Sequence, residues 1–223
     1  MGERVVKRIG HGGAGAVVRG NTLESFEAAV DIGVDMIEFD VRFSRGDLVL
    51  AHNPLDAMLR DCPTLEEALD HLRQPRFADV ELNVDVKTEG CEPEILEALR
   101  RHGLEDRALV SSQMVSVLDR IKEIDARIQC GISVGGRLAR SSQRWKDYWL
   151  NAVLDGITGG RFDALMANHK LVGQALVDAV REREGEIYCW TVDTRPIVER
   201  LEGLGVSGIT TNDPRIFAPV SAG

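Results

Sequence analysis

Strand-like and helix-like segments alternate from one end of this chain to the other, without a Pro- or Ser-rich linker between them. This order is typical of parallel β-α units packed in layers. Eight segments are candidate parallel strands, and they end near Gly10, Val41, Lys87, Ser112, Val134, Asn168, Val192 and Thr211. Because eight such units close a (β/α)₈ barrel, we predict an α/β fold of the TIM-barrel class.

Length and composition favour one domain. A chain of 223 residues with 43% hydrophobic residues can bury one large core, which suits a single barrel over residues 1–223 better than two small domains. No apolar run reaches membrane-spanning length, and no apolar signal core precedes the first strand. We therefore expect a cytoplasmic protein without a transmembrane segment. The sequence carries no signal for an oligomeric state.

The charge balance narrows the choice of partner. The formal net charge of −9 argues against nucleic acid and against an anionic membrane surface, because both favour basic proteins. A small anionic substrate is compatible with this charge if a bound metal ion reverses the local sign.

Two helix starts carry a capping signal. Asn21 is followed three residues later by Glu24, and Thr64 is followed three residues later by Glu67. Both pairs resemble capping boxes, in which two side chains satisfy the free main-chain amides of the first turn.

The stretch from residue 137 to residue 160 is predicted to be a long connection after a strand. It contains Trp145, Tyr148 and Trp149 among basic residues. These aromatic side chains either pack on the barrel or line its mouth, and we favour packing because aromatic residues most often serve burial.

Glu38 and Asp40 form the most informative polar pair. They are two residues apart in an otherwise apolar strand, and alternate residues of a strand point to the same face. Two carboxylates in one small space require a cation or a raised pKa on one member. A hard ion such as Mg²⁺ or Ca²⁺ suits carboxylate ligands best. The alternative is a solvated edge strand, which the apolar neighbours argue against.

A predicted hairpin brings His52 to this pair. The strand turns at residues 44–47 and returns through residues 48–51. Counting back across the turn, Phe39 faces His52, so His52 lies level with Asp40. A lone histidine is more often a structural donor, but one beside two carboxylates suits a general acid or base.

A third strand alternates strictly over residues 81–87 and places Asn83, Asp85 and Lys87 on one face. In a barrel this face points inward. Asp85 is then a candidate third metal ligand, and Lys87 a fixed positive charge for an anionic substrate. The alternative is an internal ion pair between Asp85 and Lys87 that serves only the barrel.

His11 follows the first strand and precedes a glycine-rich loop at residues 12–16, which can approach a ligand closely. The glycine spacing does not match a dinucleotide-binding fingerprint. The other candidates at the mouth are Ser111, Ser112, Asn168, His169, Trp190, Thr211 and Asn212.

Several of these motifs occur together in one known family. In order they are His11, Asn21-Thr22-Leu23, Glu38-Phe39-Asp40, His52-Asn53-Pro54, Asn83-Val84-Asp85-Val86-Lys87, Val110-Ser111-Ser112, Trp190-Thr191-Val192 and Gly208-Ile209-Thr210-Thr211. This series resembles the glycerophosphodiester phosphodiesterase family, and the resemblance covers nearly the whole chain.

The resemblance implies a (β/α)₈ barrel with a small β-hairpin insertion after the second strand. It implies one divalent metal ion, Mg²⁺ or Ca²⁺ with Mn²⁺ as a third choice, held by Glu38, Asp40 and Asp85. It also implies that His11 and His52 act as acid and base. For contacts to the substrate we select Lys87, Arg19, Asn53, His169 and Trp190.

Four positions depart from the family pattern. Gly12 stands where the family usually has arginine, and Gly20 where it usually has glutamate. Asn53 replaces the aspartate that usually follows the second histidine, and Asp85 is one methylene shorter than the common glutamate. The missing arginine leaves the phosphate without a guanidinium. We expect the charge to come instead from Arg19, Lys87 or Lys170.

Taken together, these features predict metal-dependent hydrolysis of glycerophosphodiesters to an alcohol and glycerol 3-phosphate. A phosphodiesterase for another diester, such as a sugar phosphodiester or a lysophospholipid, is an alternative because the arginine and the glutamate are absent. A noncatalytic barrel that binds phosphorylated ligands is a further alternative. The two histidines and three carboxylates argue against it, since simple binding needs no acid and base.

Overall fold

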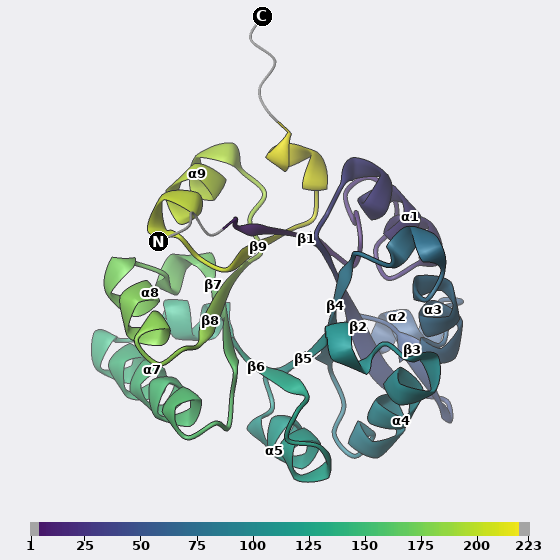
Figure 1. The fold of residues 1–223 in the computed structure, drawn as a ribbon, viewed down its shortest axis with the longest axis horizontal. Coiled ribbons are helices and arrows are strands. Elements are labelled where there is room, and N and C mark those ends of the chain that lie inside the picture. Colours follow the sequence, from purple (N-terminus) through teal and green to yellow (C-terminus); the bar gives the residue numbers. More distant parts are fainter. Residues whose placement is uncertain (1–4, 219–223) are drawn as a thin grey trace, which may run out of the picture.

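The computed structural model describes residues 5–218, which form a ring of parallel strands surrounded by helices (Figure 1). The eight strands of the ring are β1 (Lys7–His11), β2 (Met36–Ser44), β4 (Glu81–Val86), β5 (Ala108–Ser112), β6 (Gln129–Val134), β7 (Ala164–Asn168), β8 (Glu186–Trp190) and β9 (Gly208–Thr211). Strand β1 pairs with both β2 and β9, which closes the sheet. The predicted TIM barrel is confirmed. The prediction of one domain over residues 1–223 extends beyond the described residues and stays a prediction.

The helices lie outside the ring (Figure 1). They are α1 (Leu23–Ile32), α2 (Pro54–Leu59), α3 (Leu65–Leu72), α4 (Glu92–His102), α5 (Val115–Ile124), α6 (Gly136–Ala139), α7 (Gln143–Thr158), α8 (Gln174–Arg181) and α9 (Arg195–Leu204). Short 3₁₀ turns are η1 (Pro75–Phe77), η2 (Glu105–Arg107), η3 (His169–Leu171) and η4 (Pro214–Phe217). No helix within residues 5–218 combines the length and the apolar composition that crossing a bilayer requires.

One of the two predicted capping boxes is present. The Thr64 hydroxyl accepts from the Glu67 amide, and the Glu67 carboxylate accepts from the Thr64 amide. The prediction for Asn21 is wrong, because Thr22 is the residue that caps α1 and accepts from the Ser25 amide. Asn21 has a left-handed backbone, with φ of 59°, and its side chain bonds to Asp40 instead of to the helix.

The predicted hairpin is present outside the ring. Strand β2 continues past the barrel to Ser44 and pairs in antiparallel fashion with β3 (Asp47–Leu50). Val41 faces Leu50 and Phe43 faces Leu48, which is the predicted register. The Ala51 amide donates to the Asp40 carbonyl at 3.1 Å, so the hairpin returns the chain to the level of Asp40.

An apolar layer fills the barrel and determines where the polar residues lie. It consists of Ile9, Met36, Leu109, Ala164, Met166 and Tyr188. Since alternate residues of a strand share a face, the residues two positions after Ile9, Met36 and Tyr188 also point inward. These residues are His11, Glu38 and Trp190. The sequence therefore places a candidate site residue directly above the core on each of these strands.

The aromatic residues of α7 do not pack on the barrel, which contradicts our prediction for them. Trp145, Tyr148 and Trp149 are 51%, 63% and 38% exposed. The buried face of α7 is made by Val153, Leu154 and Ile157 in its second half. The first two turns therefore leave their large side chains without a surface to cover.

Replacing Gly208 by alanine tests the packing of the apolar layer. A methyl group there would lie 2.8 Å from Tyr188 Cδ1 and 2.9 Å from Ile9 Cδ1, so we expect a loss of about 1–3 kcal/mol in the free energy of unfolding. Gly203→Ala is the matched control, because its new methyl meets nothing within 4 Å in α9. It should gain roughly 0.5–1 kcal/mol. Equal stability of both variants in urea unfolding would contradict this packing.

Candidate active site

A cavity of about 120 Å³ opens at the carboxyl ends of the barrel strands. Its walls include His11 from β1, Glu38 from β2 and Trp190 from β8. They also include His52, which lies two residues after the end of β3. Side chains that are far apart in the sequence therefore meet in one small space. Most of the predicted site residues share this space.

Three carboxylates meet at the base of the site. Glu38 and Asp40 come from β2, and Asp85 comes from β4, where it pairs in register with Asp40. One oxygen of each group lies within 4.8 Å of one oxygen of the other two, and all three residues are almost fully buried. The alternative of a solvated edge strand is thus excluded for residues 36–41.

The donor set fits a hard divalent cation. Asp85 Oδ1 and Asn83 Oδ1 are buried without a hydrogen-bond donor, and unpaired buried oxygens of this kind are costly unless a cation meets them. Burial raises the pKa of Glu38 to about 7 and also raises the pKa of Asp85. Carboxylate and amide oxygens are the ligands that Mg²⁺ and Ca²⁺ prefer.

Lys87 partly neutralises this acidic group. Its Nζ lies 2.9 Å from Asp40 Oδ1 and 2.5 Å from Asp85 Oδ2. Burial disfavours the charged amine, but Asp85 and Asp40 outweigh burial and raise the pKa of Lys87. Burial likewise disfavours the charged form of Asp40, but the charge of Lys87 outweighs it and lowers the pKa of Asp40. Lys87 is thus a charged residue in the wall of the cavity. It also forms the ion pair with Asp85 that the sequence analysis gave as an alternative to a role with the substrate.

His11 is oriented by a chain of hydrogen bonds from the β8 and β9 ends. Asn212 Nδ2 donates to Asp193 Oδ2 at 2.9 Å, which leaves Asn212 Oδ1 to face His11 Nδ1 at 2.7 Å. Because that oxygen can only accept, Nδ1 carries a proton and Nε2 is left for the cavity. Burial lowers the pKa of His11. The charge of Glu38 and the hydrogen bond to Asn212 raise it by more than burial lowers it, so the net shift is upward.

Asp193 was missed by sequence reasoning, and Asn212 was only one of several mouth candidates. The signal that points to Asp193 is its position, directly after the strand-end motif that begins at Trp190. Its partner lies 19 residues further along the chain, at the end of β9. That pairing depends on β8 and β9 being neighbours in the barrel.

His52 faces His11 across the site. The ring centroids are 6.4 Å apart and the rings are inclined by 71°. Arg42 Nη2 donates to the His52 carbonyl at 3.1 Å and holds the main chain of the hairpin in place. Both histidines line the cavity, so two potential proton carriers flank one space.

Two further groups from the β1–α1 loop hold the carboxylates. Asn21 Nδ2 donates to Asp40 Oδ2 at 2.8 Å, and the Asp40 amide donates to Asn21 Oδ1 at 2.9 Å. The Gly12 amide donates to Glu38 Oε2 at 2.9 Å. This orientation requires φ of +57° at Gly12, a left-handed backbone that favours glycine.

Comparison with known proteins identifies the family of the chain. The family model described as "Glycerophosphoryl diester phosphodiesterase family" matches residues 11–62 and 48–216. The chain belongs to this family. The match confirms the resemblance seen in the sequence and the assignment of the chain as a phosphodiesterase. Its two segments include both histidines and all three carboxylates of the site.

Individual members of the glycerophosphodiester phosphodiesterase family are similar over most of their length. Glycerophosphodiester phosphodiesterase GDPD4 of Arabidopsis thaliana is 29% identical, and the match covers 93% of this chain and 70% of that protein. A glycerophosphodiester phosphodiesterase of Caldanaerobacter subterraneus is 23% identical over 92% of this chain and 93% of its own length.

Solved structures of the family share the fold. A protein from Galdieria sulphuraria described as a putative glycerophosphodiester phosphodiesterase superimposes with a TM-score of 0.81 at 18% identity, covering 96% of both chains. A phosphodiesterase of Oleispira antarctica, solved in complex with the product sn-glycerol-3-phosphate, gives a TM-score of 0.74 at 20% identity and covers 93% of both chains.

The structure separates the predicted substrate contacts into two groups. Lys87 and Trp190 line the cavity, and Arg19 lines a second pocket beside it. Asn53 instead caps α2, where its Oδ1 accepts from the Asp56 amide at 2.9 Å. His169 lies in η3 and lines neither pocket. Substrate contacts by Asn53 and His169 stay predictions.

The second pocket, of about 210 Å³, shares His11 and His52 with the cavity. Gly12 and Gly20, where the family usually has arginine and glutamate, both lie in its wall. The Arg19 guanidinium donates to the Asp61 carbonyl at 3.4 Å and forms no ion pair with a carboxylate anywhere in residues 5–218. Of the three cations expected to replace the arginine, Arg19 and Lys87 line these pockets, whereas Lys170 lines neither.

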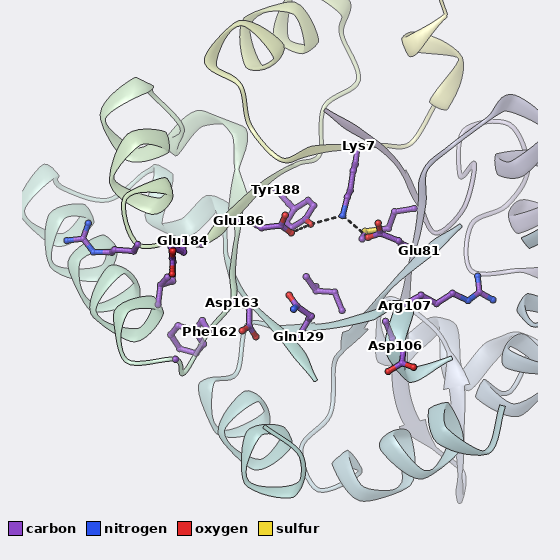
Figure 2. Close-up of a pocket in the computed structure, with 17 residues that line it drawn as sticks. Lys7, Glu81, Asp106, Arg107, Gln129, Phe162, Asp163, Glu184, Glu186 and Tyr188 are labelled. Atoms are coloured by element: carbon purple, nitrogen blue, oxygen red, sulfur yellow. Dashed lines mark hydrogen bonds and ion pairs between the residues drawn. The ribbon is translucent and has the colours of Figure 1, made fainter. Parts of the chain in front are cut away.

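A wider pocket of about 530 Å³ lies at the opposite end of the barrel (Figure 2). Several of its charged groups have partners within the protein. Lys7 Nζ lies 2.7 Å from Glu81 Oε2, and Asp163 pairs with Lys122 at 2.7 Å. The Tyr188 hydroxyl donates to Glu186. None of the family motifs that suggested acid-base chemistry reaches this pocket, so we assign the active site to the carboxyl end.

Adding a divalent ion to chelator-treated protein tests the acidic site without any assay of activity. Mg²⁺ or Ca²⁺ should raise the melting temperature, because an ion that binds only the folded state stabilises it, by about 2.7 kcal/mol at 100 times Kd. Glu38→Gln should remove most of this rise. Glu81→Gln, which changes an inward carboxylate at the opposite end of the barrel, should retain it. A wild-type melting temperature that no divalent ion changes would contradict the metal site.

Proposed function

We propose that this chain hydrolyses glycerophosphodiesters to an alcohol and glycerol 3-phosphate, using one divalent metal ion and two histidines. The observation that supports this proposal most strongly is that His11 and His52 line one cavity together with Glu38 and Asp85, and that Asp40 completes a cluster of three buried carboxylates there. The sn-glycerol-3-phosphate bound to the Oleispira antarctica phosphodiesterase gives further support for the class of substrate. The substrate is a small anion, which matches the charge argument from the sequence.

Glu38, Asp40 and Asp85 would hold the metal ion. When bound, such an ion offsets the charge of the phosphodiester oxygens and the charge that develops as phosphorus becomes five-coordinate. Asn21 and the Gly12 amide keep the carboxylates oriented through their hydrogen bonds. The ammonium of Lys87 adds a positive charge at the same wall.

His11 and His52 carry the protons. One histidine takes a proton from the attacking oxygen, and the other protonates the departing alkoxide, which is a poor leaving group without that proton. The bond from Nδ1 of His11 to Asn212 leaves Nε2 as the reactive nitrogen. Asp193 and Asn212 are positioning residues, because their hydrogen bonds orient His11.

Arg19 supplies a positive charge for the phosphate in place of the missing arginine. It lies in the pocket that both histidines share, and it lacks a carboxylate partner within residues 5–218. Lys87 supplies a second charge but is held by Asp40 and Asp85. Guanidinium groups suit phosphate oxygens because their donors are arranged in a planar fork.

Two broader properties are proposed from the sequence alone. Residues 1–223 would form one domain, and the protein would act in the cytoplasm.

Alanine variants of the histidines test the acid-base proposal. With Mg²⁺, Mn²⁺ or Ca²⁺ restored to metal-stripped protein, release of glycerol 3-phosphate from glycerophosphocholine should fall about 10²–10⁴-fold in His11→Ala and in His52→Ala. As a control, His71→Gln should keep wild-type turnover. His71 lies on α3, pairs with Glu27 and does not line the cavity.

The pattern of results separates the alternatives. A histidine variant with normal turnover has no part in the mechanism. Cleavage of bis(p-nitrophenyl) phosphate without cleavage of glycerophosphocholine or glycerophosphoethanolamine would point to another diester. No cleavage of any diester with any of the three metals would favour a noncatalytic phosphate-binding barrel.

Arg19→Ala tests the replacement of the family arginine. Loss of a charge-assisted bond to the phosphate, worth about 1.5–3 kcal/mol, should lower kcat/KM roughly 10- to 100-fold. Arg19→Lys should recover part of the loss, and Arg120→Ala on the exposed face of α5 should show none. If alanine variants of Arg19, Lys87 and Lys170 all keep their kcat/KM, no replacement cation exists among these three.

A further inference from the structure

The first two turns of α7 present an exposed aromatic cluster. Trp145, Tyr148 and Trp149 include two of the chain's three tryptophans and one of its two tyrosines. The ring of Trp145 stacks on Tyr148 at 5.5 Å and meets Trp149 edge-on at 6.2 Å. Large aromatic surfaces that stay exposed together are characteristic of an interaction site rather than of random surface composition.

This aromatic cluster lies at the same end of the barrel as the active site. Helices α6 and α7 follow the carboxyl end of β6, and α7 then runs back toward the start of β7. A Cβ built on Gly135, just before α6, would lie 3.7 Å from the ring of Trp190, which lines the cavity. The rim of the cavity is therefore continuous with the segment that carries the aromatic cluster.

A second apolar group lies on the other side of the mouth. Leu55, Met58 and Leu59 of α2 are all exposed, and their i, i+3, i+4 spacing places them on one face of the helix. Helix α2 begins two residues after His52, at the carboxyl end of the barrel. Figure 1 shows α2 and α7 on opposite sides of the ring.

The segment that carries the aromatic cluster is basic, although the whole protein has a net charge of −9. Within residues 137–149 the cations are Arg137, Arg140, Arg144 and Lys146, and Asp147 is the one acid. None of these four cations forms an ion pair with a carboxylate within residues 5–218. The charge of this segment is thus free to complement an anionic surface.

We propose that the carboxyl end of the barrel docks on an anionic phospholipid bilayer. The aromatic cluster lies at the level of the lipid headgroups, where Trp and Tyr rings are most stable because one part is apolar and another part can hydrogen-bond. The four cations face lipid phosphates, and the apolar face of α2 contacts the surface on the far side of the mouth.

Docking in this orientation turns the cavity toward the membrane. A phosphodiester carried by a lysophospholipid would then reach His11 and His52 without leaving the bilayer surface. This consequence rests on the proposed function, whereas docking itself does not.

Vesicle binding by the full chain tests the proposal. We expect binding to phosphatidylcholine vesicles that contain phosphatidylglycerol, weaker binding to phosphatidylcholine alone, and weakening by salt, which screens surface charge. The triple variant W145A/Y148A/W149A should bind at least roughly tenfold more weakly. Arg140→Gln and Arg144→Gln should each weaken binding about fivefold, which corresponds to about 1 kcal/mol. Arg120→Gln is the matched control and should bind as wild type.

The same variants should hydrolyse soluble glycerophosphocholine at the wild-type rate, which shows that they are folded. Failure of wild type to bind anionic vesicles, or equal binding by the triple variant, overturns docking. A concentration-dependent dimer that only the triple variant loses, without vesicle binding, also overturns it in favour of a subunit contact. Vesicle binding without cleavage of any soluble diester would instead refute the proposed function and leave docking in place.

Discussion

Hydrogen bonding between β1 and β9 closes the sheet, and this closure determines where the other features lie. Because β1 also pairs with β2, the inward residues of all eight strands are arranged in layers around one axis. Ile9 and Met36 belong to the apolar layer, and His11 and Glu38 follow two residues later at the carboxyl ends. An open sheet would leave Trp190 on β8 far from β1 and β2. The ring is therefore the physical reason that one cavity exists.

The pairing of β2 with β4 creates an electrostatic problem that the site resolves with its own residues. Glu38, Asp40 and Asp85 are brought together with little access to water, where like charges repel strongly. Lys87 offsets part of this charge, and hydrogen bonds from Asn21 fix the direction of one carboxylate. The oxygens that still lack donors account for the affinity that we expect for a cation. The buried carboxylates that cost free energy on folding are therefore the same groups that make the site reactive.

The mouth of the barrel differs from the rest of the surface. The cavity is lined by charged and polar groups, whereas α2 and the start of α7 expose apolar side chains on either side of it. Elsewhere most arginines are paired with carboxylates, as Arg161 is with Asp119, but Arg140 and Arg144 are not. The average charge of the protein therefore says little about this face. Local composition and position at the rim are what suggest a membrane.

The sequence by itself determined the parallel α/β order, the placement of Glu38 and Asp40 on one face of the same strand, and the hairpin that brings His52 back to that level. Each of these follows from strand periodicity and turn chemistry, which act over a few residues. Only the tertiary structure decided that Asn212, held by Asp193, orients His11, because that contact joins strand ends that meet only in the closed ring. It also decided which aromatic residues stay exposed. Burial depends on what the fold places opposite a side chain, and no local pattern contains that information.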